Sequence, residues 1–173
     1  MVLFGLIALF ASGYCFVSRT VLAMNKKRDE YSAVVALLLH IRAKLSSGGG
    51  SLYAILRGFE SEPLSKNGLL GVLRTDAVGN VESSGACEKN QSFFRDNLSK
   101  IRFVIEKADA KKLLGYLESY GKCYIEEERR KLSEITDHFI QKEKWFCEKN
   151  EKDIKALWIV FTFLFVGVLI FLI

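Results

Sequence analysis

The densest run of ionisable side chains in the sequence is EEERR at residues 126–130. Paired carboxylates can act as acid and base only where burial or a charged neighbour tunes them. Three consecutive glutamates on a helix point in different directions around its axis, so they do not converge on one substrate. The run is therefore typical of a solvated helix face rather than of a catalytic site.

Cysteine and histidine are the next candidates for chemistry, and they are few and scattered. Cys15 falls in an apolar segment, while Cys87, Cys123 and Cys147 form no close pair, so no disulfide framework is predicted. Lys122 precedes Cys123, but no Cys–His arrangement follows that would activate the thiol. The two histidines, His40 and His138, are too few for a zinc site. We expect no metal and no cofactor.

The glycine-rich stretch SSGGGS at residues 46–51 resembles a phosphate-binding loop only in composition. A P-loop continues with Gly-Lys-Ser/Thr, whose lysine reaches the phosphates, whereas this chain continues with SLYAIL. The stretch instead predicts the end of one helix and Ser51 as the N-cap of the next. With no catalytic motif left, we expect no catalytic residues, no small-molecule substrate and a protein that is not an enzyme.

Apolar segments lie at both ends of the sequence. Residues 2–18 carry no charge, and residues 156–173 contain no charged side chain, amide or histidine. Eighteen helical residues reach roughly 27 Å, close to the hydrocarbon thickness of a bilayer. Both segments are predicted to span a membrane. A cleaved signal peptide is the alternative for the first, although signal peptides carry basic residues before the apolar run.

Basic residues flank both apolar segments on the side of the intervening chain. They follow the first segment as Arg19, Lys26, Lys27 and Arg28 and precede the second as Lys149, Lys152 and Lys155. The positive-inside rule therefore places residues 25–155 in the cytoplasm. The expected organisation is an N-terminal transmembrane helix at 1–24, a cytoplasmic helical domain at 25–155 and a C-terminal transmembrane helix at 156–173.

The net charge of +5 is expected to act at the membrane surface. Anionic lipids attract clustered lysine and arginine, so membrane lipids are expected partners. The candidate contacts are Arg19, Lys26, Lys27, Arg28, Lys152 and Lys155. Basic and acidic residues alternate elsewhere, as in EKNEKDIK, and no arginine-rich stretch is present, so nucleic acid is not an expected partner.

The region between the segments has helical periodicity. A stripe of apolar residues predicts one helix continuing from the first segment: Tyr31, Val34, Leu38, Ile41 and Leu45. His40 lies beside this stripe, at the core or its edge. Two short helices are expected around Pro63, and a loop at residues 75–90.

Three further helices are predicted in the second half of the chain. The first carries the stripe Phe94, Leu98, Ile101 and Ile105. The second has Asp109 as N-cap and the stripe Leu113, Leu117, Tyr120 and Tyr124. The third runs from about Tyr124 into the last segment, with a seam at Ile125, Leu132, Ile135, Phe139 and Phe146 that Glu128 and Lys142 interrupt. The fold class is all-α, an antiparallel helical bundle carried between two transmembrane helices as a membrane hairpin.

The first apolar segment carries small residues on one helical face, namely Gly5, Ala8, Ser12 and Cys15. Small residues let helices approach closely in lipid. This face is the predicted membrane-helix packing surface.

The arrangement as a whole resembles the stage III sporulation protein AB family of endospore-forming bacteria. The local matches are HIRAKLSSGGGSL at 40–52 and LLGYLESYGK at 113–122, and the resemblance covers nearly all of the chain. That family is itself similar to the helical cytoplasmic domains of type II secretion inner-membrane platform proteins. Two departures are KCYIEEERRK at 122–131, where members often have a Leu-Gly turn with a nearby aspartate, and Gly50-Ser51-Leu52, where Thr-Pro-Leu is usual.

The resemblance implies an integral protein of the mother-cell membrane that serves as a platform for the channel between mother cell and forespore. Its expected partners are other channel subunits and a cytoplasmic secretion-type ATPase. The alternative is a stand-alone membrane adaptor or regulator unrelated to sporulation. The residues by themselves indicate a membrane-anchored helical module without catalytic motifs.

Overall fold

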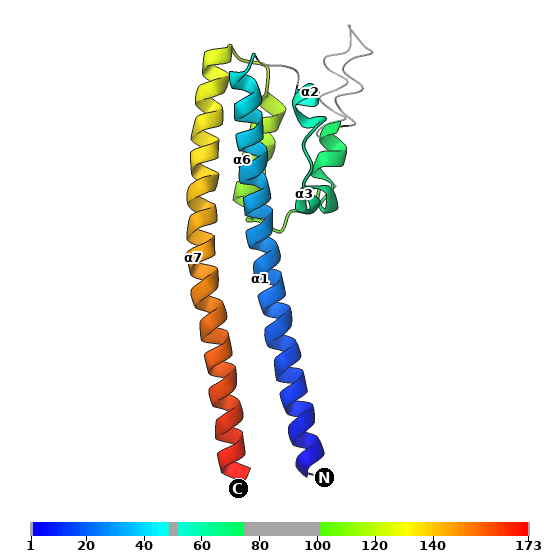
Figure 1. Ribbon diagram of the computed structural model, residues 1–173, viewed down its shortest axis with the longest axis vertical. Coiled ribbons are helices and arrows are strands. Elements are labelled where there is room, and N and C mark those ends of the chain that lie inside the picture. Colours follow the sequence, from blue (N-terminus) through cyan, green and yellow to red (C-terminus); the bar gives the residue numbers. More distant parts are fainter. Residues whose placement is uncertain (1, 49–51, 75–100, 173) are drawn as a thin grey trace. The chain divides into compact units, whose positions relative to one another are not determined.

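The computed structural model describes residues 2–48, 52–74 and 101–172, and within these ranges the fold is all-α, with no strand. The helices are α1 (Val2–Ser46), α2 (Leu52–Leu56), α3 (Glu62–Lys66), α6 (Lys107–Ser119) and α7 (Ile125–Leu172) (Figure 1). Residues 69–74 are also helical. The chain forms two compact units, one of Met1–Arg28 with Lys144–Ile173 and one of Asp29–Glu143. Both α1 and α7 contribute to each unit.

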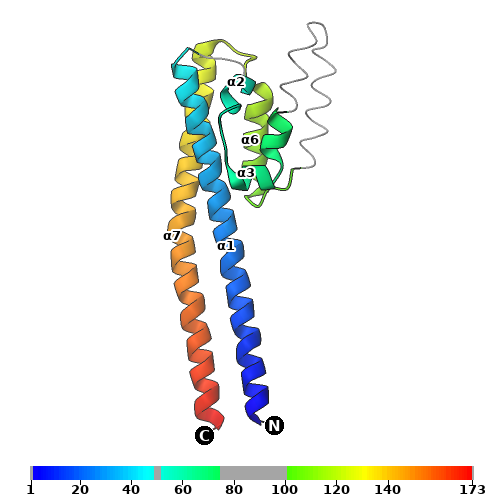
Figure 2. The same cartoon turned by 45° about the vertical axis from the view of Figure 1, so that its right-hand side comes forward.

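The unit of residues 29–143 is a helical bundle with an apolar core. The predicted stripe of α1 is confirmed, because Tyr31, Val34, Leu38 and Ile41 are fully buried and Leu45 nearly so. α1 and α7 run antiparallel here (Figure 1), where Tyr31 contacts the ring of Phe139 and Ser32 hydrogen-bonds Glu143. Figure 2 shows α6 lying beside these two helices. The core of α6 and α7 consists of Leu113, Leu117, Leu132, Ile135 and Phe139.

The segment before α6 differs from the prediction. Residues 101–106 are not helical, so the expected helix through Ile101 and Ile105 is wrong in this part. The reason is that its backbone donors have other partners: Val104 and Ile105 donate to the Glu30 carboxylate, and Arg102 donates to the Asn67 carbonyl. Phe94, Leu98, Ser51 and the loop predicted at 75–90 lie outside the described residues.

The two ends of α6 also differ from those predicted from the sequence. Asp109 was predicted as the N-cap, but α6 begins at Lys107 with Glu106 in the cap position, so Asp109 lies inside the first turn. The helix ends at Ser119, and Gly121 adopts φ +77°, a left-handed conformation that favours glycine. Tyr124 therefore lies outside α6 and is 88% exposed instead of continuing its stripe. The prediction that α7 runs from about Tyr124 into the last apolar segment is confirmed.

The short helices in the middle of the chain close one side of the core. Pro63 lies in the first turn of α3, where its missing N–H costs nothing, rather than between two helices as expected. Leu56, Leu64 and Leu69 are fully buried. His40 lies at the edge of the core as predicted, with Nε2 2.9 Å from the Ile55 carbonyl oxygen and its ring against Phe59.

The unit of residues 1–28 and 144–173 is an antiparallel pair formed by the ends of α1 and α7 (Figure 1). Both helices are long and apolar enough to cross a membrane, with windows of mean hydropathy 1.5 and 2.1 that are almost entirely exposed. Exposed apolar surface of this extent is what a lipid environment would cover.

Candidate functional site

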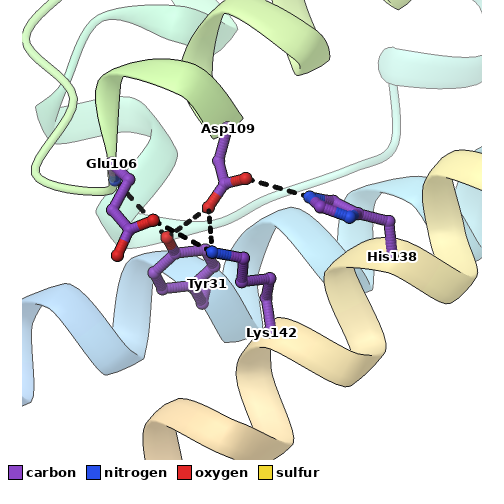
Figure 3. A network of polar contacts seen from close by, with 5 residues as sticks. All are labelled: Tyr31, Glu106, Asp109, His138 and Lys142. Atoms are coloured by element: carbon purple, nitrogen blue, oxygen red, sulfur yellow. Dashed lines mark hydrogen bonds and ion pairs between the residues drawn. The ribbon is translucent and has the colours of Figure 1, made fainter.

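A network of five polar side chains joins three helices of the bundle (Figure 3). At its centre is Asp109, which is 4% exposed. The Tyr31 hydroxyl donates to Asp109 Oδ2 over 2.6 Å, and His138 Nε2 lies 2.9 Å from Asp109 Oδ1. Lys142 Nζ lies 3.6 Å from Asp109 Oδ2 and 3.0 Å from Glu106 Oε2. One buried carboxylate thus connects α1, α6 and α7.

Local helix geometry brings these groups together. Tyr31 occupies the buried stripe of α1, so its hydroxyl points across the core. Asp109 lies in the first turn of α6, where the helix dipole favours a negative charge. His138 and Lys142 are four residues apart on α7 and therefore share one face. The N–H of Glu106 adds a weaker contact to the Tyr31 oxygen at 3.4 Å.

The contacts of this network shift the pKa values of three of its members. Burial alone would raise the pKa of Asp109, but the hydrogen bonds from Tyr31 and His138 and the charge of Lys142 outweigh it and hold that pKa below its usual value. Burial, together with the hydrogen bond to Asp109, raises the pKa of Tyr31, so the phenol stays protonated. The hydrogen bond to Glu106 raises the pKa of Lys142. The Asp109 carboxylate is therefore stabilised as an anion by the groups of α1 and α7 that surround it.

An aspartate–histidine pair also occurs in hydrolytic sites, where the histidine activates a nearby nucleophile. In the described residues the polar partner of the His138 ring is Asp109, and Asp109 in turn is held by Tyr31 and Lys142. The geometry is that of a contact between helices. The contacts of Asp109 hold α1, α6 and α7 together.

Glu30, next to Tyr31 on α1, forms a second buried polar contact. It is 3% exposed and accepts from the side chain of Asn67 and from the N–H groups of Val104 and Ile105. Asn67 in turn accepts from the N–H of Leu69. Glu30 and its neighbour Tyr31 thus hold residues 104–106, which lead into α6. Neither Glu30 nor the network of Asp109 was predicted as a site from the sequence.

The run EEERR is only partly the solvated face that the sequence predicted. Glu126 and Glu127 are exposed, but Glu128 is 3% exposed and accepts from the N–H of Gly121 at 3.3 Å. Its Oε1 and the hydroxyls of Tyr116 and Tyr120 are buried without a hydrogen-bond partner in the described part of the chain. Burial, followed by the charge of Glu128, raises the pKa of both tyrosines.

The lysine beside Cys123 in space is Lys131 rather than Lys122. Lys131 Nζ donates to Cys123 Sγ over 2.8 Å and forms an ion pair with Glu127 at 2.9 Å. These contacts, with that to the thiol the largest, raise the pKa of Lys131. Glu127 and Lys131 lie at the start of α7, and the contact with Cys123 links them to the turn that follows α6.

In the other unit, aromatic residues make the contact between the apolar parts of α1 and α7. Phe10 packs against Phe161 and Phe165 at ring-centre distances of 5.3 and 4.4 Å. Tyr14 packs against Trp158 at 5.8 Å. Gly13 lies so close to Phe161 that an added Cβ would be 2.7 Å from its ring. One small residue therefore lets the two helices approach.

The small residues singled out in the sequence lie elsewhere on α1. Gly5, Ala8, Ser12 and Cys15 are all exposed, and Ser12 hydrogen-bonds the Leu9 carbonyl of its own helix. A Cβ added at Gly5 would meet nothing within 4 Å. The role of these four residues as a membrane-helix packing surface stays a prediction.

The predicted membrane-surface cations lie beyond the apolar parts of the same helix pair. Arg19, Lys26, Lys152 and Lys155 are exposed, and Lys27 and Arg28 are half-buried. Lys27 Nζ lies 4.5 Å from the centre of the Phe146 ring, and Lys149 Nζ lies 4.8 Å from that of Trp145. Asn25 and Asn150 hydrogen-bond between them at 3.3 Å.

Comparisons with known proteins give no match: no family model, no curated protein and no solved structure matches the chain.

Proposed function

We propose that the chain is a non-enzymatic, membrane-anchored platform subunit of a sporulation secretion-like channel between mother cell and forespore. Its helical bundle would bind other channel subunits, including a cytoplasmic secretion-type ATPase. The family resemblance of the sequence supports this assignment. The observation that carries the anchoring part is the pairing of two exposed apolar helix ends in one unit.

The bundle supports a binding role. Its buried carboxylates Glu30 and Asp109 are used to hold helices and loops together. A domain stabilised in this way presents a fixed surface, and recognition by a preformed surface avoids the cost of ordering it on binding. The proposed site of action is the cell membrane, with residues 25–155 in the cytoplasm.

Crosslinking from sporulating cells tests the channel assignment. A photo-crosslinking residue would replace Lys111, which is exposed on α6, and a matched probe would replace Phe4, which is exposed in the apolar unit. We expect the Lys111 probe to capture a secretion-type ATPase or another channel subunit, and the Phe4 probe to capture membrane-embedded neighbours. Capture of proteins unrelated to sporulation at both probes would instead favour the stand-alone adaptor.

Thiol labelling tests the orientation. In a variant without native cysteines, Lys111→Cys should resist a membrane-impermeant reagent in intact cells and react after permeabilisation. Labelling of intact cells would place the bundle on the outer side and contradict the proposal.

A further inference from the structure

We infer that the helix pair carries a binding surface for anionic phospholipid headgroups, formed by Arg19, Lys26 and Lys152. The inference rests on the membrane anchoring proposed above and adds a lipid preference to it. It is argued from the distribution of charge, from the register of the two helices and from the contacts of the basic side chains.

The excess positive charge of the chain is confined to one layer of the molecule. Residues 19–28 and 144–155 contain eight basic and three acidic residues, a net charge of +5. This equals the net charge of the entire chain. Residues 29–143 contain 17 basic and 17 acidic residues and are neutral, and the apolar segments carry no charge. This layer therefore carries the net charge that is complementary to an anionic surface.

The register of the pair places this layer at the edge of the apolar region. Tyr14 contacts Trp158 and Asn25 contacts Asn150, so Arg19 of α1 lies at about the level of Lys155 of α7. These are the first charged residues after the two apolar segments. From Arg19 to Lys26 the helix rises about 10 Å, comparable to the depth of a lipid headgroup layer.

Aromatic side chains mark the same boundary. Tyr14 and Trp158 lie just inside the level of Arg19, and Trp145, which is 48% exposed, lies beyond it beside Lys149. Tyrosine and tryptophan are enriched at membrane–water interfaces because their rings combine an apolar body with a polar group. Their positions agree with a headgroup layer around Arg19 and Lys155.

Apart from Lys144 at the far end of the layer and Lys149 over the Trp145 ring, three cations of this layer are available to a ligand. Lys155 is paired with Glu151 at 2.6 Å. Within the described part of the chain, Arg19, Lys26 and Lys152 are exposed and form no ion pair with a carboxylate. An exposed cation held beside a bilayer attracts phosphate-bearing anionic lipids, and its attraction adds to that of its neighbours. The geometry favours a lipid surface because Arg19 and Lys26, seven residues apart, share one face of α1, and Lys152 of α7 lies at a level between them.

Spin-labelled lipids test the inference on the full chain in bilayers. The chain would be reconstituted in phosphatidylcholine, and the motionally restricted fraction of chain-labelled phosphatidylglycerol would be compared with that of phosphatidylcholine carrying the same label. We expect a several-fold preference for phosphatidylglycerol at low salt, decreasing as ionic strength rises. The triple variant Arg19→Gln, Lys26→Gln, Lys152→Gln should lose most of this preference.

A matched control separates position from net charge. The variant Lys107→Gln, Lys111→Gln, Lys112→Gln removes three exposed cations from α6 and should keep the preference. A preference that survives in the first variant, or that falls equally in both, would overturn the inference. An equal restricted fraction for the two lipids in the unaltered chain would overturn it too, while leaving membrane anchoring intact. If neither lipid showed a restricted fraction, the anchoring itself would be contradicted.

Discussion

The hydroxyl of Tyr31 lies 2.6 Å from the carboxylate of Asp109, and 78 residues of chain separate the two. Both side chains are buried, so this hydrogen bond holds α1 to the start of α6 in the interior of the bundle. Asp109 is shared with His138 and Lys142, which extends the contact to α7. The stability of the bundle should therefore depend on groups that each helix contributes to one carboxylate.

Removing the Tyr31 hydroxyl should destabilise the bundle. Tyr31→Phe keeps the ring in the core but leaves Asp109 with one donor fewer, and we expect a loss of about 1.5–3 kcal/mol, the usual range for a hydrogen bond to a charged group. Thermal unfolding of the full chain in detergent, followed by circular dichroism, measures the effect. Tyr124→Phe is the control, because Tyr124 is 88% exposed. Equal melting temperatures of the two variants would refute a stabilising role for this contact.

Acid should weaken the same network. The pKa of Asp109 is lower in the folded chain than in the unfolded chain, where it is about 3.9, so the unfolded state binds more protons at acidic pH. The contribution to stability is thus complete above about pH 5 and is lost as the pH falls through the folded pKa of Asp109.

The variant Asp109→Asn tests this contribution, because it removes the titrating group. Its free energy of unfolding should be lower at neutral pH and should change less between pH 5 and pH 2 than that of the unaltered chain. Urea titrations at several pH values measure both quantities. An unchanged acid dependence in Asp109→Asn would assign the effect to other carboxylates.

Much of the helical architecture was predictable because apolar periodicity is a local signal. The stripe from Tyr31 to Leu45 and the long helix α7 follow directly from it. The polar contacts were not predictable in this way, since Glu30 bonds to residues 74 and 75 positions away. One signal was present in the sequence. Glu128 and Lys142 interrupt the apolar seam of α7, and a charged residue at a core position requires a buried partner.

The turn after α6 shows why the predicted end of that helix was wrong, and the helix pair contains a contact that was not predicted. The apolar stripe of Leu113, Leu117 and Tyr120 continues in the sequence past the end of α6. The helix ends there because Gly121 adopts a left-handed conformation, which the apolar periodicity does not indicate. The contact between α1 and α7 uses Gly13 with large aromatic rings around it. A search for several small residues on one helix face does not detect a single glycine, such as Gly13, that packs against an aromatic ring of the other helix.

The pair Asn25 and Asn150 should fix the register of α1 against α7. Asn150 is 2% exposed and donates to Asn25 over 3.3 Å. An asparagine pair between helices specifies alignment at some cost in stability, because sliding the helices would leave the buried Asn150 without the half-buried Asn25 as its partner.

Replacing both asparagines by leucine should therefore leave the helices paired but less uniquely aligned. Spin labels at Phe4 and Ile170, both exposed, would report this as a broader distance distribution. The single variant Asn25→Leu should be less stable than the double variant, because it leaves Asn150 buried without a partner. A distribution as narrow as that of the unaltered chain would show that other contacts set the register.

Bulk at Gly13 should separate the apolar parts of α1 and α7. A Cβ at this position would lie 2.7 Å from the Phe161 ring, closer than carbon atoms approach, so Gly13→Leu must displace either the ring or the helix. Gly5→Leu is the matched control, because a Cβ at Gly5 meets nothing within 4 Å. With spin labels at Phe4 and Ile170, we expect a longer mean distance for Gly13→Leu than for the control. The variant Ala8→Leu, Ser12→Leu should weaken association with other membrane helices, because bulk on a face of small residues holds helix backbones apart. Equal distances for Gly13→Leu and Gly5→Leu would show that the glycine does not control the approach of the two helices.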